Sequence, residues 1–312
     1  MTITLIGHLC LDIIRHPDGK ETRSYGGIYF SLATLANLLP SQDTISPIFG
    51  VGKEEYEPFL EHVKLYSNID SSGIYKFAGP TNQVHLLYND SADRVECSRF
   101  IADPIAIKRI RPYLKTNMLL INMISGFDIT LETLDEIRME TRDHHTPIYM
   151  DIHSLTLGIN ENFTRFFRPV NAWRRWLFML HTAQMNEREA HTLSSEKLDE
   201  VNLANQTLAL NTRAMIITRG KRGCTVFIDE HKHAQRFDIP GMQPELSVDP
   251  TGCGDVFAAA YCAHFMKTND ISNSVRFANQ VAAFKSRLQG SLQIDKLSTF
   301  RLLDISTEVS TT

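Results

Sequence analysis

The sequence has few of the features that mark secreted, membrane-spanning or nucleic-acid-binding proteins. Its five cysteines are scattered and odd in number, with no Cys-x-x-Cys pair, which argues against a disulfide framework or a zinc site. Lysine and arginine (32) are outnumbered by aspartate and glutamate (36) and form no basic run, so nucleic-acid binding is not indicated. No apolar run approaches the ~18 residues that cross a bilayer. We therefore predict a cytoplasmic protein with reduced thiols and neither a nucleic-acid nor a membrane partner.

Other absences narrow the class of fold. The apolar N-terminus lacks the basic segment of a signal peptide and is interrupted early by Asp12, so it is predicted to be a buried strand. No Gly-x-Gly-x-x-Gly follows that strand, which argues against a nucleotide-binding dehydrogenase. Internal repeats and low-complexity segments are also missing. Charged (22%) and apolar (43%) residues stand in ordinary globular proportions, and 312 residues suffice for one large α/β domain.

The chain does contain an alternation of apolar strands and amphipathic helices. Strands are predicted at 2–7, 44–49, 118–123, 147–151, 182–185 and 214–218. Helices are predicted at 28–39, 54–67, 129–144, 256–266 and 271–288. Right-handed crossovers between such elements imply a mainly parallel sheet covered on both faces. Two further alternating runs, 83–88 and 94–100, are joined by polar turn residues and indicate a hairpin.

The most informative stretch is a glycine-rich turn, residues 248–255, that leads into the alanine-rich helix. Gly252 and Gly254 lack a Cβ, so a ligand can approach the backbone closely there. The first turn of a helix presents N–H groups without intrahelical partners at its positive end, which makes it an anion site. Asp255 then has two interpretations. It is either a helix N-cap, or a base beside an anion hole that takes a proton from a hydroxyl attacking a phosphate.

Polar groups also follow the first predicted strand, where ligands of open α/β sheets bind. Asp12 is either a turn residue or an acceptor for the hydroxyl groups of a sugar. Gly26 and Gly27 open the helix 28–39, and paired glycines before a helix let backbone amides face a ligand. His153, just after the strand 147–151, is either structural or directed into the cleft.

Two later segments allow a structural and a functional interpretation. Asn186 and Glu189 are about one helical turn apart, which fits a capping box. The same oxygen-bearing side chains suit a hydrated Mg²⁺, a hard cation that prefers oxygen ligands and keeps several waters. In the turn 219–223, Arg219 and Lys221 are either phosphate-binding groups or solvated turn charges.

The stretch 249–255 resembles the signature of the ribokinase family, the pfkB family of carbohydrate kinases, which carries Asp-Thr-x-Gly-Ala-Gly-Asp about four-fifths along the chain. Here Pro250 follows the first aspartate and Cys253 replaces alanine, but neither change removes an amide from the Gly-Cys-Gly turn. The segment 26–33 is similar to the family's Gly-Gly-x-x-x-Asn-x-Ala, with Ser31 in place of asparagine. The family's Asn-x-x-Glu and Thr-x-Gly-x-x-Gly motifs are matched at 186–189 and 218–223.

This resemblance implies a ribokinase-like three-layer α/β/α fold, in which residues 1–312 form a single kinase domain. It also implies a small β-sheet lid made by about 9–25 and 71–100. Acceptor contacts would come from Asp12, Gly26, Gly27 and Ser31, and ATP contacts from Asn186, Glu189, Thr218, Gly220, Gly223 and Asn279. Asn186 and Glu189 would hold Mg²⁺ through water. A monovalent cation and a homodimer formed through the lid are further expectations from the family.

The reaction expected from these features is transfer of the γ-phosphoryl group of ATP to a hydroxyl of a sugar or sugar-like acceptor. Asp255 would be the base, and the amides of Gly252, Cys253 and Gly254 would form the anion hole. Two alternatives stay open: a nucleoside kinase of the same fold, and a sugar-binding regulator without catalysis. The replacement of asparagine by Ser31 argues against a simple ribokinase or fructokinase.

Overall fold

The computed structural model describes residues 1–15, 20–88, 94–230, 233–242 and 249–302. Three predicted features lie outside the described residues. They are the hairpin turn at 89–93, Val248 of the glycine-rich stretch, and the C-terminal limit of the predicted domain.

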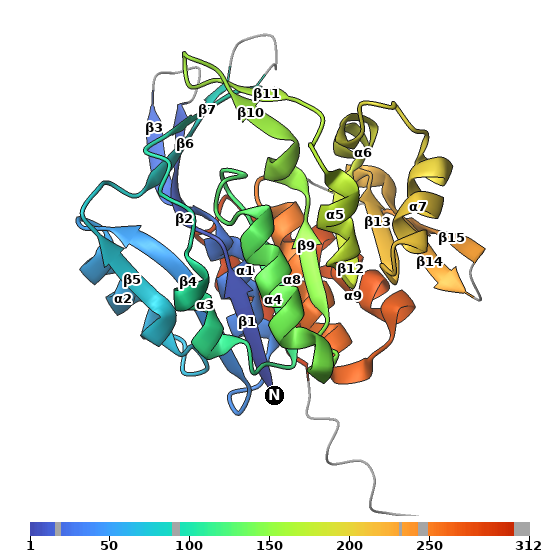
Figure 1. Ribbon diagram of the computed structural model, residues 1–312. Coiled ribbons are helices and arrows are strands. Elements are labelled where there is room, and N and C mark those ends of the chain that lie inside the picture. Colours follow the sequence, from blue (N-terminus) through green and yellow to red (C-terminus); the bar gives the residue numbers. More distant parts are fainter. Residues whose placement is uncertain (16–19, 89–93, 231–232, 243–248, 303–312) are drawn as a thin grey trace, which may run out of the picture.

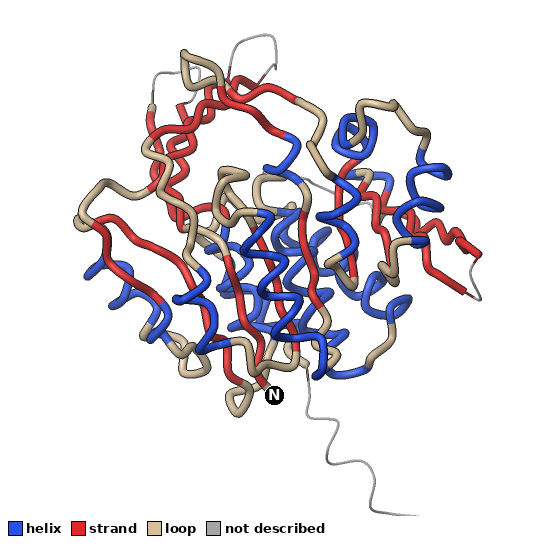
Figure 2. The backbone as a smooth tube through the Cα atoms, in the orientation of Figure 1, coloured by secondary structure: helices blue, strands red, loops and turns tan. Residues whose placement is uncertain are grey.

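A nine-stranded sheet forms the centre of the molecule (Figures 1 and 2). From one edge to the other, its strands are β15 (His233–Pro240), β14 (Gly223–Glu230), β13 (Ala214–Thr218), β12 (Thr182–Asn186), β9 (Ile148–Asp151), β8 (Met118–Asn122), β1 (Thr2–Ile6), β4 (Thr44–Gly52) and β5 (Ile74–Phe77). All neighbouring strands run parallel except in the pairs β13–β14 and β14–β15, which are antiparallel. The predicted mainly parallel sheet is therefore confirmed.

Helices cover both faces of this sheet and complete three layers. One core contains side chains of α1 (Ile28–Leu38), α2 (Tyr56–Val63), α8 (Cys253–Thr268) and α9 (Ile271–Lys285). The other contains side chains of α3 (Ile107–Ile110), α4 (Leu131–Thr141), α5 (Trp173–Phe178), α6 (Glu187–Leu193) and α7 (Glu200–Ala209). Short 3-10 turns lie at Ser71–Gly73, Arg111–Tyr113, Arg142–His144, His153–Thr156, Gly220–Arg222 and Ile294–Phe300.

The two cores follow from the period-two alternation of the central strands. Leu5 of β1 and Leu120 of β8 belong to the core on the α1 and α8 side. Their neighbours Ile6 and Ile121 belong to the opposite core. Because successive side chains of a strand point to opposite faces, a strand that is apolar throughout must be covered on both sides.

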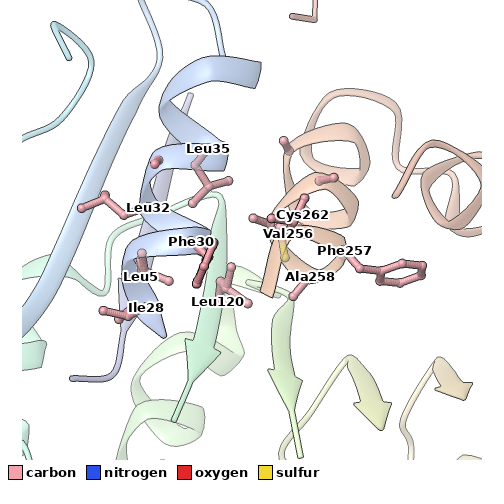
Figure 3. Packing of buried hydrophobic residues seen from close by; sticks show 14 of the residues in the cluster. Leu5, Ile28, Phe30, Leu32, Leu35, Leu120, Val256, Phe257, Ala258 and Cys262 are labelled. Atoms are coloured by element: carbon pink, nitrogen blue, oxygen red, sulfur yellow. The ribbon is translucent and has the colours of Figure 1, made fainter. Parts of the chain in front are cut away.

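The helices α1 and α8 pack side by side on one face (Figure 3). Phe30 and Leu35 of α1 and Val256 and Cys262 of α8 point into the space between them. Small alanines fill the middle of α8, and Ala258, Ala259 and Ala260 are fully buried. This packing fixes the start of α8 against the start of α1, where the glycine-rich turn lies.

A separate four-stranded sheet covers one end of the molecule (Figure 1). Its order is β3 (Glu21–Gly27), β2 (Leu9–Arg15), β6 (Asn82–Tyr88) and β7 (Arg94–Arg99). We call it the lid sheet. The predicted contribution of residues around 71–78 is wrong, because β5 pairs with β4 in the main sheet, with Phe49 opposite Ile74. The predicted strand ended at Phe49, but β4 extends to Gly52. The longer edge of β4 pairs with β5, and Ile74 is buried there.

The parallel strands end together at the edge of the main sheet that faces the lid sheet. Their last residues include Asn122, Asp151, Asn186 and Thr218, all of them polar. Carboxyl ends of parallel strands are where ligands bind in open α/β sheets. Over the described part of the chain, no helix combines the length and apolar character needed to cross a bilayer.

Candidate active site

A cavity of about 680 Å³ lies at this edge, and it is lined by the lid sheet, the strand ends and the start of α8. The lid side contributes Cys10, Asp12, Val84, Leu86 and Glu96. The strand ends contribute Asn122, Asp151, Gln184, Asn186 and Thr218, and the glycine-rich turn contributes residues 250–255. Segments far apart in the sequence thus meet in one place, as the carboxyl-edge rule predicts.

The glycine-rich turn is shaped by Gly252. This residue caps α8 with a φ of 76°, in the left-handed region that only glycine adopts without strain. A Cβ at this position would lie 2.5 Å from the ring of Phe30. The fully buried Lys285 also holds the turn, because its ammonium donates to the carbonyl groups of Thr251 and of Asp249 (3.3 Å).

The amides of the turn are not all available to a ligand. The N–H of Cys253 donates to the carbonyl of Pro250 at 3.1 Å. For Gly252 and Gly254, no acceptor of the backbone N–H is found among the described residues. The predicted three-amide anion hole is therefore corrected to two amides, since the tight turn itself uses the middle one.

Asp255 is the third residue of α8 and not its N-cap, so the capping interpretation is wrong. Its half-buried carboxylate lines the cavity and accepts a hydrogen bond from Asn122 Nδ2 at 2.8 Å. Burial raises the pKa of Asp255 to about 6, although the bond from Asn122 acts in the opposite direction. A carboxyl group with this pKa is ionised for the most part at neutral pH and can still accept a proton readily.

Ser31 lies behind Asp255 and does not line the cavity. Its side chain is fully buried, donates to the carbonyl of Asp255 (3.2 Å) and accepts from Asn122 Nδ2 (2.7 Å). The expected direct contact of Ser31 with an acceptor is inconsistent with this position. A serine in place of the family's asparagine instead joins two residues of the cavity wall, Asn122 and Asp255.

Asp12 and the glycine pair come together on the lid side of the cavity. Asp12 on β2 and Gly27 at the end of β3 both line it. Gly26 lies beside Asp12 and not in the wall, and a Cβ on Gly26 would come within 2.1 Å of the Asp12 carboxylate. Gly26 therefore gives room for the carboxylate, whereas Gly27 exposes backbone to the cavity.

Asn186 and Glu189 form the predicted capping box at the start of α6 and also line the cavity. The buried Glu189 carboxylate accepts from the backbone N–H and Nδ2 of Asn186, each at 2.6 Å, and from Nδ1 of His153 at 2.5 Å. An ionised carboxylate offers about four lone-pair positions, so about one remains for a water molecule of a hydrated cation. In the described part of the chain, no cluster of three or more metal-binding side chains occurs.

Asp151, His153 and Gln184 complete this wall, so the interpretation of His153 as directed into the cleft agrees with its position, whereas Gln184 has no recognisable signal in the sequence. Gln184 Nε2 donates to Asp151 (2.9 Å) and to the carbonyl of Gly254 (3.1 Å), so it ties two strand ends to the start of α8. Burial and the charge of Glu189 raise the pKa of Asp151 to about 7. Burial lowers the pKa of His153, but the contact with Glu189 outweighs it and raises the value to about 9. For Asp151, its position at the end of a predicted strand is the sequence feature that indicates a place in the cavity wall.

The loop after β13 forms the far end of the cavity. Thr218, Gly220, Lys221 and Gly223 line it opposite Asn279, whose Nδ2 donates to the carbonyl of Pro240 (3.1 Å). Small residues, Gly241, Ala282 and Ala283, line the same end. Five of the residues at this end are thus glycine or alanine.

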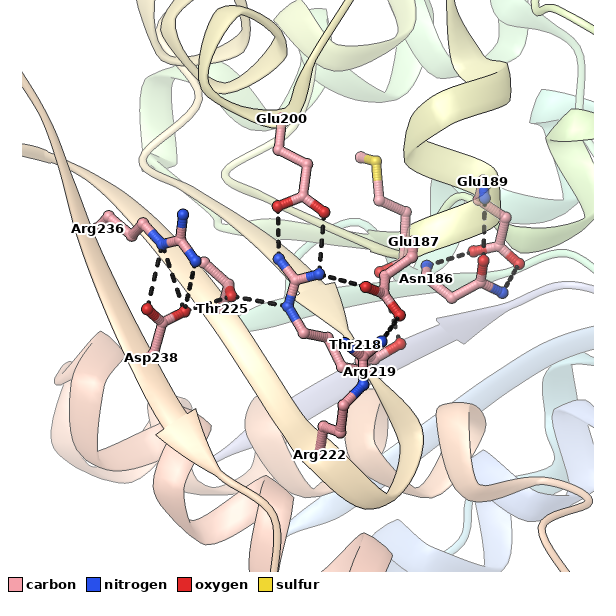
Figure 4. A network of polar contacts seen from close by, with 11 residues as sticks. Asn186, Glu187, Glu189, Glu200, Thr218, Arg219, Arg222, Thr225, Arg236 and Asp238 are labelled. Carbon is pink, nitrogen blue, oxygen red and sulfur yellow. Dashed lines mark hydrogen bonds and ion pairs between the residues drawn. The ribbon is translucent and has the colours of Figure 1, made fainter.

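Arg219 is not among the residues that line the cavity, so its interpretation as a phosphate-binding group is not supported. Figure 4 shows its guanidinium between carboxylates. Its guanidinium binds Glu200 and Glu187, each at 2.5 Å, and donates to Thr225 Oγ1 at 2.9 Å. Glu187 directly follows Asn186, so Arg219 ties the loop after β13 to the start of α6. Its charge is thus used within the protein.

Comparisons with known proteins agree with this architecture. The model of the pfkB family carbohydrate kinases matches residues 163–294. The chain is similar to a cytidine kinase of Thermococcus kodakarensis, with 23% identity over 88% of this chain and 92% of that protein. A pyrophosphate-dependent kinase in the ribokinase family has a similar structure, with a TM-score of 0.77, 19% identity and coverage of 95% and 99% of the two chains. The ribokinase of Thermotoga maritima gives a TM-score of 0.75, 17% identity and coverage of 96% and 98%. The fold is therefore ribokinase-like.

Two glycine variants test the shape of the turn. Gly252→Ala is expected to lower the free energy of unfolding by about 2–4 kcal/mol, from left-handed strain and the collision with Phe30. Gly254→Ala is the matched control, because its Cβ would meet no atom closer than 3.5 Å and its φ is ordinary, so we expect a change below about 1 kcal/mol. Denaturant unfolding of both variants measures the difference, and equal effects would show that the turn relaxes freely.

Proposed function

We propose that the chain is a member of the pfkB family of carbohydrate kinases and that it transfers the γ-phosphoryl group of ATP to a hydroxyl of a sugar or sugar-like acceptor. As a member it is a phosphotransferase with an alcohol group as acceptor, which favours catalysis over a silent sugar-binding regulator. The observation that carries the proposal is the Asp255 carboxylate. It lines the same cavity as the amides of Gly252 and Gly254 at the start of α8, for which the described residues provide no acceptor.

Asp255 acts as the general base. It takes the proton of the acceptor hydroxyl while that oxygen forms a bond to the γ-phosphorus and the bond from phosphorus to the leaving oxygen of ADP breaks. Asn122 orients the carboxylate through its 2.8 Å bond and leaves the other oxygen for the hydroxyl. Asp12, on the opposite wall, holds further hydroxyl groups of the acceptor.

The amides of Gly252 and Gly254 stabilise the charge on the transferring group. They lie at the positive end of α8, a helix of 16 residues, so the helix dipole adds to their effect. Such donors are fixed before the reaction and require no reorganisation, which makes them effective in a water-poor cavity. Cys253 serves the turn instead, through its bond to Pro250.

The donor phosphates extend from this turn toward Lys221, and the base of ATP occupies the far end beside Asn279. The small side chains there leave space for an adenine ring. Asn186 and Glu189 fit a hydrated Mg²⁺ held through water, which would neutralise phosphate charge when bound. A monovalent cation stays a prediction from the family, and activity with and without K⁺ tests it.

A nucleoside acceptor is the second candidate. The similarity to a cytidine kinase over most of the chain favours it. The apolar side chains of Val84, Leu86 and Ile124 in the cavity wall suit a nucleobase as well as the carbon face of a sugar. Turnover with cytidine and inosine, compared with D-ribose, D-fructose and myo-inositol, separates the two candidates.

Two finer expectations accompany this function. The described part of the chain holds all five cysteines as free thiols, which fits the reducing conditions of the cytoplasm. A homodimer formed through the lid sheet is tested by light scattering of the purified protein.

Asp255→Asn is expected to leave folding intact and to lower turnover by a factor on the order of 10² to 10⁴, the usual range for a positioned acid–base group. The amide keeps the size of the side chain but cannot take the proton. Release of ADP at saturating ATP measures the effect, and thermal unfolding checks the fold. Turnover close to that of the unaltered protein would refute the assigned role.

The pH profile gives an independent test of the same base. Because the pKa of Asp255 is about 6 and the base must be ionised, kcat/KM should fall as the pH decreases below about 6, about tenfold for each pH unit. Asp151→Asn is the control, since the pKa of Asp151 is also raised, to about 7. If kcat/KM of this variant no longer falls at low pH, the fall is caused by protonation of Asp151. The assignment of Asp255 as the base would then be wrong.

The donor is tested by replacing ATP with pyrophosphate, because the structure with the TM-score of 0.77 is that of a pyrophosphate-dependent kinase. We expect turnover with ATP and little with pyrophosphate. Ala283→Leu should fill the far end of the cavity and raise the KM for ATP about tenfold, a loss of about 1.4 kcal/mol in binding. Equal turnover with the two donors, or an unchanged KM in the variant, would contradict an ATP site.

A further inference from the structure

The acceptor end of the cavity is rich in carboxylates. Among the described residues that line the cavity, five are acidic: Asp12, Glu96, Asp151, Glu189 and Asp255. Asp12 and Glu96 lie on the lid side, Asp151 at a strand end and Asp255 at the start of α8, whereas Glu189 lies in α6 beside the proposed Mg²⁺ position. An acceptor must therefore bind among negative charges, which already face the phosphates of the donor.

The cations of the cavity wall are few, and those near the acceptor end are already bound. Among the described lining residues they are His153, Arg165 and Lys221. His153 contacts Glu189 at 2.5 Å. Lys221 belongs to the donor end, in the loop after β13. Within the described part of the wall, Arg165 alone remains as a cation that an acid group on the acceptor could meet.

The guanidinium of Arg165 is engaged through each of its three nitrogens. Nη1 forms an ion pair with Glu96 at 2.9 Å, Nε donates to Ser98 Oγ at 2.5 Å, and Nη2 donates to the carbonyl of Ile124. The side chain is 5% exposed, so it sits inside the wall with little contact with water. A second anion at this place would have to compete with the partly buried carboxylate of Glu96.

This ion pair joins two elements that approach the lid from different parts of the chain. Glu96 lies on β7 of the lid sheet, and Arg165 lies on β11 (Arg165–Phe167), which pairs with β10 (Leu157–Ile159). The segment before β11 extends the lid edge, since Thr164 bridges Cys97 and the N–H of Ser98 donates to the carbonyl of Phe163 at 2.9 Å. The hairpin thus anchors the lid at one place, beside Arg165 (Figure 1).

We propose that the acceptor is an uncharged polyol, and that the Glu96–Arg165 pair is the element of the cavity wall that rejects sugar acids and sugar phosphates. This inference rests on the proposed function, because it names the acceptor class of the same site. Glu96 accepts hydrogen bonds from acceptor hydroxyls while Arg165 fixes its carboxylate in position.

The physical basis is the cost of placing an anion in a confined and acidic cavity. Like charges at close range in a low-dielectric site repel strongly, and a buried charge is tolerated only when it is paired. Hydroxyl groups have no such cost and can donate to the carboxylates of Asp12 and Glu96. Discrimination therefore arises from repulsion of the wrong acceptor as much as from contacts with the right one.

Paired probes on the unaltered protein test the proposal. Each pair joins a neutral compound to its anionic relative: D-ribose with D-ribose 5-phosphate, D-fructose with D-fructose 6-phosphate, myo-inositol with myo-inositol 1-phosphate, and D-glucose with D-gluconate. ADP release and calorimetric binding are measured for every compound in the presence of ATP or a non-hydrolysable analogue. We expect at least one neutral probe to bind, and each binding neutral probe to exceed its partner about tenfold or more.

The variant Glu96→Gln tests the role of the pair. It leaves the Arg165 guanidinium without its carboxylate, so the preference for the neutral over the anionic member of the best pair should fall about tenfold. A merely structural role would weaken both members alike and leave their ratio unchanged. The matched control is Glu196→Gln, which breaks an exposed ion pair with Arg174. It should leave the turnover with each probe, and the ratio between the neutral and the anionic probe, unchanged.

Separate outcomes distinguish this inference from the proposed function. Binding of neutral probes without ADP release would refute the kinase reaction and support the acceptor class. A sugar phosphate or sugar acid that binds more tightly than its neutral partner would overturn the inference, and so would failure of every neutral probe to bind. An unchanged ratio in Glu96→Gln, with the fold intact by thermal unfolding, would remove the role of the pair.

Discussion

The site depends on a buried ammonium group that holds a turn. Lys285, near the end of α9, is fully shielded from water and directs its charge at the carbonyls of Thr251 and Asp249. A buried cation is stable only with such partners, so the turn cannot move away without exposing an unpaired charge. Asp249 adds to this constraint by accepting from the N–H groups of Thr251 and Gly290. The start of α8 is thereby fixed at the edge of the sheet.

From this fixed point the chemistry of the cavity follows. In the proposed reaction the positive end of α8 attracts an anion, while Asp255 on its first turn must remain able to take a proton. The two demands are compatible because burial raises the pKa of Asp255, and Asn122 and Ser31 hold that residue from behind. The side chain therefore stays aimed at the cavity and does not fold back to cap its own helix.

Much of this arrangement is predictable from sequence because it depends on local patterns. Strand ends, the Gly-Cys-Gly turn and the Asn186–Glu189 capping box are each encoded within a few neighbouring residues. What could not be predicted depends on contacts across the fold. Ser31 meets Asn122 over 91 positions of sequence, and the edge of β4 that captures Ile74 exists only once the sheet has formed. Arg219 likewise finds its carboxylate partners only when α6 and α7 pack beside its loop.

The lid shows how such long-range contacts decide what the cavity accepts. A sheet tied to the body only by its own strand connections would be free to tilt, and its side chains would define no fixed chemistry. The hairpin of β10 and β11 removes this freedom on one side, because Arg165 links Glu96 and Ser98 of the lid to the backbone of Ile124 after β8. The acidic wall is consequently held in place before any acceptor arrives. The burial that raises the pKa of Asp255 also weakens the screening of this wall by water, so under the proposed function a neutral acceptor is the one that such a cavity admits at least cost.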